Sequence, residues 1–125
     1  MPWVRLDDEF AQHPKVVSLP YRGRWLHIAA LCYSNRMLTD GFIPIAMLAA
    51  LCPHEREDPI DEGPYQLAGE LVAVGLWEKV DGGYAIHDFH QYQPSKREVL
   101  AARKRLRKAR SETGQKGAKQ RWQSG

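Results

Sequence analysis

The sequence predicts a small, mostly helical α+β domain that is followed by a basic helix. Three observations lead to this prediction. Apolar residues recur at helical spacing in three segments of the first 75 residues. A β-hairpin pattern follows them, with two arms rich in aromatic and β-branched residues around an Asp-Gly-Gly turn. The last 31 residues carry most of the positive charge.

Length and composition limit the protein to one modest core. The chain has 125 residues, of which 43% are apolar and 26% are charged. This apolar content argues against disorder throughout, and no apolar run approaches the roughly 18 residues that a membrane helix needs. The first nine residues lack the basic and apolar regions of a signal peptide. We therefore expect a cytoplasmic protein that has no membrane partner.

The first third of the chain predicts one short and one long helix. Residues 3–6 are predicted to be extended, and a brief helical stretch follows, which Pro14 interrupts or restarts. From Tyr21 to about Arg36, apolar residues recur at intervals of three and four, as a buried helix requires. This segment is the most secure helix of the domain.

Several cysteines and tryptophans are assigned to the core by their neighbours. Cys32 and Cys52 lie in apolar surroundings and not at the spacings of a disulfide framework, so we expect both to be reduced and buried. Trp25 and Trp77 lie in apolar periodic segments, which predicts that both are core residues. Trp3 is expected to cover an edge of this core.

The middle of the chain predicts a short strand, a short helix and a loop. Residues 39–41 form a Thr-Asp-Gly turn signal, and residues 42–44 are long enough only for a stub of strand. Residues 45–51 are an apolar helical run that ends before Pro53. Residues 53–64 are acidic and contain prolines and a glycine, which predicts a loop.

A third helix and a hairpin complete the predicted domain. The helix begins near Pro64 or Tyr65 and runs to Val74, with Gly75 as its stop signal. Residues 76–80 and 84–89 are the two arms of the hairpin. Three helices followed by a small two-stranded sheet is the order of elements in a winged helix-turn-helix domain, with the hairpin as its wing. We assign residues 1–94 to this domain.

Residues 95–125 predict a separate basic helix and a flexible end. Ser95 and Glu98 match a capping box, so a helix is expected over residues 96–110. The helix carries one narrow apolar stripe, formed by Val99, Ala102, Leu106 and Ala109. Such a stripe packs weakly, so the helix docks on the body, pairs with a copy, or forms fully only when phosphates cancel its self-repulsion. Gly114 and Gly117 predict a flexible end that carries Trp122.

Charge divides the chain at the same point. Residues 1–94 hold seven basic and thirteen acidic side chains, a net charge of −6. Residues 95–125 hold eleven basic and two acidic side chains, a net charge of +9. An asymmetry of this kind is typical of a segment that binds a polyanion, either nucleic acid or an acidic membrane face.

Four segments resemble one known family. They are residues 8–10 with 13–15, residues 39–44, residues 71–77, and residues 84–94, which include Phe89-His90-Gln91-Tyr92-Gln93. In this order they resemble the amino-terminal winged-helix domain of phage and prophage replication proteins, of the replisome-organiser type that actinobacterial phages carry. Residues 114–122 also resemble the Gly-Lys-rich linker of that group. The resemblance implies double-stranded DNA binding in replication initiation or transcriptional regulation, in the cytoplasm or nucleoid of a bacterial host.

Charge counting assigns most DNA contacts to the basic tail. The predicted third helix has no long basic or amide side chain apart from Gln66, and Glu70 would repel phosphate. The candidate DNA-binding residues are Arg22, Arg24 and Lys79 in the body, and Arg97, Arg103, Lys104, Arg105, Arg107, Lys108, Arg110, Lys116, Lys119 and Arg121 in the tail. We expect phosphate contacts more than base contacts, because the basic residues surround the helix and Asn, Gln and Ser are absent from residues 96–110.

The sequence argues against an enzyme, a cofactor and a metal. Cys52 with His54, and His87 with His90, match no standard zinc spacing. The chain has no Walker-type loop, serine elbow or recognisable Cys-His pairing. A rival function remains: the acidic body could bind a host replication or transcription enzyme while the tail holds DNA nearby. A second copy of the chain is a further candidate partner.

Overall fold

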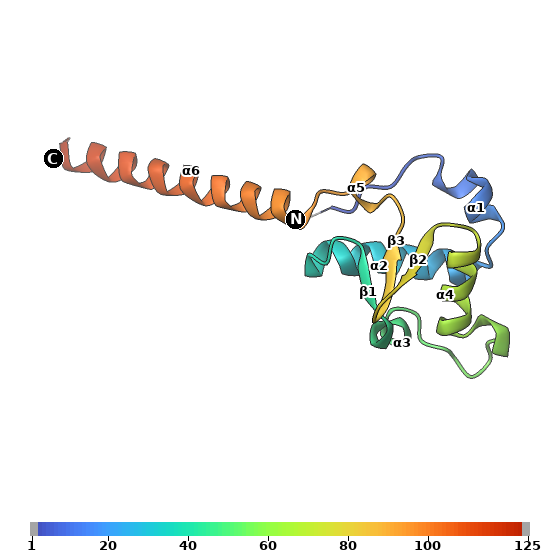
Figure 1. The fold of residues 1–125 in the computed structure, drawn as a ribbon. Coiled ribbons are helices and arrows are strands. Elements are labelled where there is room, and N and C mark those ends of the chain that lie inside the picture. The colour runs from blue at the N-terminus through green and yellow to red at the C-terminus, as the bar shows by residue number, and fades with distance from the viewer. Residues whose placement is uncertain (1–2, 124–125) are drawn as a thin grey trace. The chain divides into compact units, whose positions relative to one another are not determined.

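The computed structural model describes residues 3–123, without the side chains of Tyr92 and of residues 114–123. The chain forms two compact units, Met1–Gln93 and Pro94–Gly125, which we call the body and the tail (Figure 1). The predicted boundary between residues 94 and 95 lies one residue away from this division. In the part that the structure describes, no helix is both long and apolar enough to cross a membrane.

The body begins with three helical elements. A 3-10 helix, η1 (Phe10–Gln12), precedes the short helix α1 (Pro14–Val17) and the long helix α2 (Tyr21–Met37). The sequence predicted that Pro14 either interrupts or restarts the helical stretch. It restarts it, because Pro14 lies in the first turn of α1. The long helix predicted from Tyr21 is confirmed.

Short elements connect α2 to the next long helix. The strand β1 (Phe42–Pro44) leads into the 3-10 helix η2 (Ile45–Met47) and the helix α3 (Leu48–Leu51). A second 3-10 helix, η3 (Ile60–Glu62), lies in the acidic loop and precedes α4 (Pro64–Ala73). Gly75 follows α4 with a φ of +84°, a value that favours glycine and explains the predicted stop.

The sheet has three strands, whereas the hairpin pattern predicted two. The strands β2 (Trp77–Val80) and β3 (Gly83–Ile86) form the expected hairpin, and β1 pairs antiparallel with β3 to give the order β1-β3-β2. Gly83 permits this close pairing, because a Cβ atom there would lie 2.0 Å from the Ile43 carbonyl oxygen. The short helix α5 (Phe89–Tyr92) ends the body.

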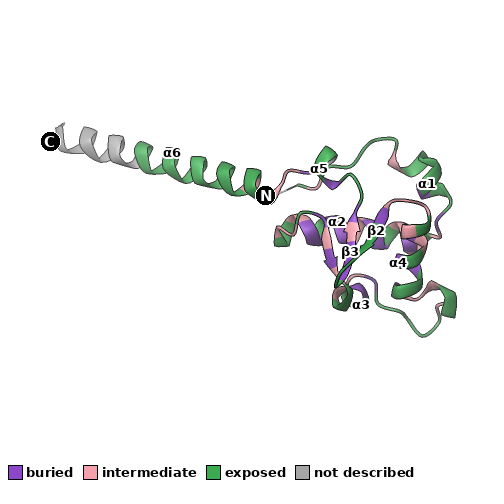
Figure 2. Cartoon of the chain, in the orientation of Figure 1, coloured by how far each residue is buried: buried purple, intermediate pink, exposed green. Residues whose placement is uncertain are grey.

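The core lies between α2, α4 and the sheet (Figure 2). Its fully buried side chains include Leu26, Ile43, Leu71 and Trp77, which is 1% exposed. The predictions for Trp77 and for buried Cys52 are therefore confirmed.

Three other core assignments are wrong. Trp25 is 59% exposed, Trp3 is 80% exposed, and Cys32 is also exposed. The physical reason for Trp25 and Cys32 is that α2 is apolar on two sides, and only the side with Leu26 and Ala30 packs on the core. Apolar periodicity alone does not distinguish these two sides.

A side chain joins the two ends of the body. The backbone N–H of Arg5 donates to Oε1 of Gln93 at 3.0 Å, and Nε2 of Gln93 donates to the carbonyl of Arg5. The amide group of Gln93 therefore pairs with the backbone of Arg5 in the way that a neighbouring strand would. Because Gln93 is buried, water does not compete with this pair.

The tail is one helix, α6 (Lys96–Gln123). Its predicted start is confirmed, because the Glu98 N–H donates to Oγ of Ser95 at 3.1 Å. The helix continues beyond the predicted end at Arg110, so the expectation of a flexible end at Gly114 and Gly117 is wrong for the backbone up to Gln123. The side chains of Lys116, Lys119, Arg121 and Trp122 lie outside the described residues.

Candidate nucleic-acid interface

The described part of α6 presents an excess of exposed positive charge. Residues 96–113 carry eight basic and two acidic side chains, and all of these side chains are exposed. No basic residue from Arg97 to Arg110 forms an ion pair within the part of the chain that the structure describes. These charges are therefore available to an anionic partner.

The helix sorts these charges onto one face. At about 100° per residue, the basic side chains of residues 96–110 lie within an arc of roughly 160°, except Arg105. The sequence-based expectation that they surround the helix is thus wrong, and the preference for phosphate contacts rests on the absence of Asn, Gln and Ser from residues 96–110. The opposite side carries Val99, Ala102, Leu106 and Ala109, together with the carboxylates of Glu98 and Glu112. Only Val99 among the described side chains of α6 is half-buried.

The length of the basic face suits several phosphates. From Lys96 to Arg110 a helix rises by about 21 Å. B-form DNA carries about one phosphate per 1.7 Å of its axis when both strands are counted, so about twelve phosphates lie along this distance. The duplex therefore offers this face more phosphates than the face has cations.

Self-repulsion on this face links binding to helix stability. Arg103 and Arg107 are four residues apart, as are Lys104 and Lys108, and each such pair of like charges destabilises a helix by about 0.2–0.5 kcal/mol. Phosphates placed between these side chains would remove the repulsion. Bound polyanion should therefore stabilise α6.

Arg22 has a structural role that sequence reasoning missed. Its Nη1 lies 2.6 Å from Oδ2 of Asp58, and its Nη2 donates to the Pro53 carbonyl at 2.6 Å. Its Nε donates to the carbonyl of Glu62 at 3.4 Å. The guanidinium of Arg22 thus holds the acidic loop, residues 53–64, against α2. We leave it out of the interface.

Arg24 is also held by its own chain, whereas Lys79 is exposed. The guanidinium of Arg24 donates to the carbonyls of Leu19 and Val17 at 3.1 and 2.9 Å, which satisfies the end of α1. It also stacks over the ring of Tyr21 at 4.7 Å from the centroid. Lys79 lies exposed on β2. Of the three candidate residues in the body, only Lys79 therefore stays in the interface.

The exposed side of α4 lacks the groups that read a DNA groove. It presents Tyr65, Gln66, Gly69 and Ala73 to solvent and carries no basic residue. The Oε2 atom of Glu70 is buried, with no hydrogen-bond partner among the described residues. This agrees with the expectation that α4 is a poor recognition helix.

The four residues considered for zinc lie in two separate places with their own contacts. Nε2 of His54 lies 3.0 Å from the Pro59 carbonyl oxygen, and Nδ1 of His87 lies 3.0 Å from Oε1 of Glu78. Burial raises the pKa of the Cys52 thiol above its ordinary value, so this thiol is a poor metal ligand at neutral pH. Within the described residues, no group of three or more His, Cys, Asp or Glu side chains could hold a metal ion.

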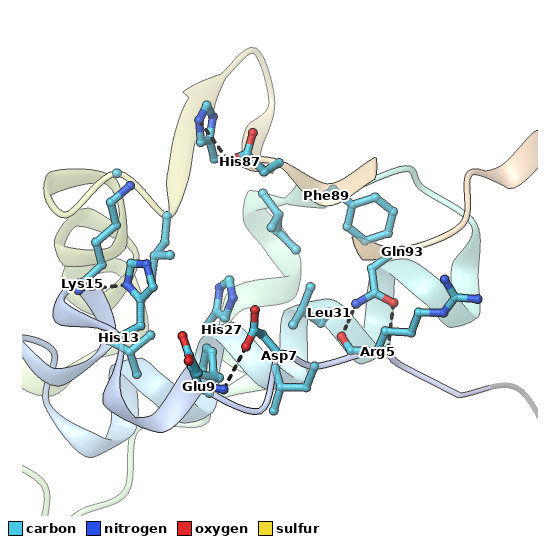
Figure 3. Close-up of a pocket in the computed structure, with 17 residues that line it drawn as sticks. Arg5, Asp7, Glu9, His13, Lys15, His27, Leu31, His87, Phe89 and Gln93 are labelled. Atoms are coloured by element: carbon cyan, nitrogen blue, oxygen red, sulfur yellow. Dashed lines mark hydrogen bonds and ion pairs between the residues drawn. The ribbon is translucent and has the colours of Figure 1, made fainter. Parts of the chain in front are cut away.

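The body also contains a cavity of about 190 Å³ (Figure 3). Asp7 and Glu9 from the N-terminal segment, His27 from α2, and His87 and Phe89 from the region after β3 contribute to its wall. Among the described residues, no serine, threonine or cysteine lines it. The cavity therefore offers carboxylates, imidazoles, the cations of Arg5 and Lys15, and apolar surface.

His27 is the residue of this cavity that sequence reasoning passed over. Burial lowers its pKa from 6.5 to about 4, so it is neutral at pH 7. Its ring stacks on Phe10, with 5.7 Å between the ring centroids. The only sequence signal is a histidine at an apolar position of a helical repeat, which does not separate a ligand-binding histidine from a core histidine.

Comparisons with known proteins add no relative. No family model, no curated protein and no solved structure matches the chain. Its function must therefore be inferred from its own charge distribution and geometry.

Proposed function

We propose that this protein is a non-enzymatic DNA-binding protein whose helix α6 contacts the phosphates of double-stranded DNA. The observation that carries the proposal is the basic face of α6, whose side chains from Arg97 to Arg110 are exposed and form no ion pair with any described residue. The body has a net charge of −6 and would repel DNA, so the binding energy must come from the tail.

We infer that the body is a winged helix-turn-helix. Three helices, α2, α3 and α4, precede the β2–β3 hairpin, and this order supports the inference. The exposed ammonium of Lys79 on β2 would then lie on the wing and add one phosphate contact. Together with the resemblance to phage replication proteins, this suggests a role in replication initiation or in transcriptional regulation inside a bacterial host.

The acidic loop favours a second candidate function. Residues 55–62 contain five acidic side chains, and Arg22 ties this loop to α2 through the carbonyls of Pro53 and Glu62 and the carboxylate of Asp58. An ordered acidic surface suits a basic patch on a host replication or transcription enzyme. A pull-down from nuclease-treated host lysate separates the two functions, because a partner bridged by DNA is lost and a directly bound partner remains.

The salt dependence of DNA binding tests the first proposal. If the basic face of α6 neutralises about four to six phosphates, the logarithm of affinity should fall against the logarithm of salt concentration with a slope of roughly −4 to −5. Replacing Arg103 and Arg107 with alanine should flatten this slope by about two units and weaken binding to all sequences alike. Fluorescence anisotropy with a labelled duplex measures both effects.

A matched control removes two exposed arginines from the body, Arg5 and Arg56, whose side chains belong to no proposed DNA contact. This double alanine variant loses the same charge and should keep the slope of the parent protein. A slope near zero for the parent protein would contradict the proposal. A loss of about 1–3 kcal/mol per arginine on one preferred sequence only would show base reading instead of phosphate contact.

A further inference from the structure

The cavity of the body contains a buried hydrogen-bond donor that no described residue uses. Nδ1 of His27 accepts a hydrogen bond from the indole N–H of Trp77, so the proton of the neutral imidazole is on Nε2. His27 is only 7% exposed, and among the described residues Nε2 has no hydrogen-bond partner. A buried polar atom of this kind needs an explanation, and a bound molecule is one.

The Nε2 atom of His27 opens into the cavity. His27 lines the cavity, and Figure 3 shows its ring among the side chains that surround it. Among the described buried side-chain atoms, only Oε2 of Glu70 is both sealed from solvent and unpaired, so Nε2 keeps an accessible surface. Burial alone lowers the pKa of His27, whereas a carboxylate at Nε2 would raise it. Asp7 and Glu9 in the wall therefore do not occupy this donor.

The other polar groups of the described wall are either paired or exposed. Gln93 is buried as well, but both polar atoms of its amide are bound to the backbone of Arg5. The remaining titratable residues of the wall are all exposed: Arg5, Asp7, Glu9, His13, Lys15, His87 and Asp88. His27 is therefore the buried side chain of this wall that has a polar atom to offer.

The rest of the wall is apolar and encloses the volume of a single ring. Val16, Leu31, Ile86 and Phe89 are all buried and line the cavity. The cavity volume is about 190 Å³, and an apolar cavity of about 150 Å³ can hold benzene. A six-membered ring with a small substituent therefore fits.

We propose that this cavity binds a small uncharged ring compound with one oxygen acceptor, of which a cyclic ketone is the simplest example. The oxygen accepts from Nε2 of His27, and the ring lies against the apolar wall. The hydrogen bond satisfies the buried donor, while contact with the ring removes apolar surface from water. All residues of the site belong to the body, so binding does not depend on the basic face of α6.

The charges of the wall favour an uncharged ligand over an ion. They are two cations and three carboxylates, on Arg5, Lys15, Asp7, Glu9 and Asp88. The wall therefore has no excess of positive charge, and an anion beside the neutral ring of His27 would lose hydration without gaining an ion pair. A cation would meet a donor at Nε2 where it needs an acceptor.

Titration of the full chain with three matched probes tests the site. Cyclohexanone has the proposed ring and acceptor, methylenecyclohexane has the same shape without the acceptor, and cyclohexanecarboxylate adds a negative charge. We expect a dissociation constant of about 0.1–1 mM for cyclohexanone. Cyclohexanecarboxylate should bind at least about tenfold more weakly, because its charge is not paired in the cavity.

The NMR signal of the Trp77 indole N–H reports on His27 during this titration. A hydrogen bond from Nε2 to a ketone makes Nδ1 a stronger acceptor, because hydrogen bonds in series strengthen one another. Cyclohexanone should therefore shift the indole proton of Trp77 downfield, whereas methylenecyclohexane should not. Neither probe has an aromatic ring current. The signal is identified in a variant whose other three tryptophans are phenylalanine.

Val16→Phe tests whether the probe occupies the cavity. Val16 is 2% exposed and lines the cavity, so the larger side chain should fill it and weaken cyclohexanone binding by at least about tenfold. Val72 packs half-buried against the core outside the cavity wall, so Val72→Phe is the matched control and should bind like the parent protein. Thermal unfolding checks that both variants stay folded.

His27→Met tests the donor without filling the cavity. The thioether sulfur can still accept weakly from the Trp77 indole, but methionine provides no donor. The preference for cyclohexanone over methylenecyclohexane should fall by about 2- to 10-fold relative to the parent protein. Comparing this preference between the two proteins cancels the different hydration of the two probes.

Four results would overturn the proposal. The parent protein could fail to bind cyclohexanone at up to about 10 mM, which would mean that the cavity holds only water. Both uncharged probes could shift the Trp77 signal equally, which would mean that the donor is not used. Cyclohexanecarboxylate could bind more tightly than the ketone, which would make this an anion site. Binding that Val16→Phe leaves unchanged would place the ketone elsewhere.

Discussion

The indole N–H of Trp77 donates a hydrogen bond to Nδ1 of His27 at 3.0 Å, and both side chains are buried in the body. The bond joins β2 to α2 across the core, between residues that are 50 positions apart. It also requires Nδ1 to be unprotonated, so the neutral ring carries its proton on Nε2. The state of this one imidazole therefore affects the packing of the helix on the sheet.

We expect acid to destabilise the body through His27. Its pKa is about 4 in the folded protein and about 6.5 in the unfolded chain, so between these values the unfolded chain binds a proton that the folded body does not. Stability is fully present above pH 6.5 and is lost as the pH falls toward 4, by up to about 3 kcal/mol. Urea unfolding at a series of pH values measures this loss.

His27→Asn is the matched variant for this measurement. The amide oxygen of asparagine can still accept from the Trp77 indole, but it does not titrate. The variant should be less stable at every pH because it leaves a gap, and its stability should depend less on pH between 6.5 and 4. An identical pH dependence in both proteins would mean that His27 is not responsible.

Ser34 supports the turn between α2 and β1. The buried N–H of Gly41 donates to Oγ of Ser34 at 2.6 Å, and the hydroxyl groups of Ser34 and Thr39 lie 2.7 Å apart. Ser34→Ala should lower the free energy of unfolding by about 1–3 kcal/mol, because it leaves a buried donor without a partner. Ser18→Ala removes an exposed hydroxyl and should have a much smaller effect in the same urea titration.

Replacing two glycines with alanine should change the stability of the body in opposite directions. At Gly83 an added Cβ would lie 2.0 Å from the Ile43 carbonyl oxygen, so Gly83→Ala should separate β1 from β3 and cost about 3 kcal/mol or more. At Gly69, which is exposed in α4, an added Cβ would meet nothing within 4 Å besides its chain neighbours and the helix's own backbone. Gly69→Ala should therefore stabilise the body by about 0.5–1 kcal/mol. Thermal unfolding measures both effects. A change of the two melting temperatures in the same direction would disprove this account.

Deleting residues 95–125 should leave a folded body that has lost most of its affinity for DNA. The deletion removes a net charge of +9 and leaves −6, while the buried core side chains among the described residues all lie within residues 16–93. Circular dichroism checks folding, and anisotropy with a labelled duplex measures affinity. A truncated body that binds duplex DNA nearly as well as the full chain would assign the contacts to the body.

Local chemistry made much of the secondary structure predictable. Pro14 can begin a helix, Gly75 can adopt a positive φ, and Ser95 can accept from the N–H of Glu98, and each of these properties belongs to a few consecutive residues. Helix starts and stops near these residues were therefore predicted from the sequence.

Contacts between distant residues were not predictable in the same way. The exposure of Trp25 depends on which side of α2 packs against α4 and the sheet, and apolar periodicity is satisfied by either side. The role of Arg22 depends on Asp58, which is 36 positions away, and the role of β1 depends on its pairing with β3. The basic face of α6 could have been found from the sequence by plotting the angles of residues 96–110.

The pairing of Gln93 with Arg5 makes the body suitable for transplantation. Residues 5 and 93 lie side by side, close to the two ends of the body. The body therefore has the geometry of a domain that can be inserted into a surface loop of another protein. Both junctions would then need only short linkers, and the carrier's loop would not have to stretch. In such a chimera, the amide of Gln93 would hold the two ends of the inserted body together.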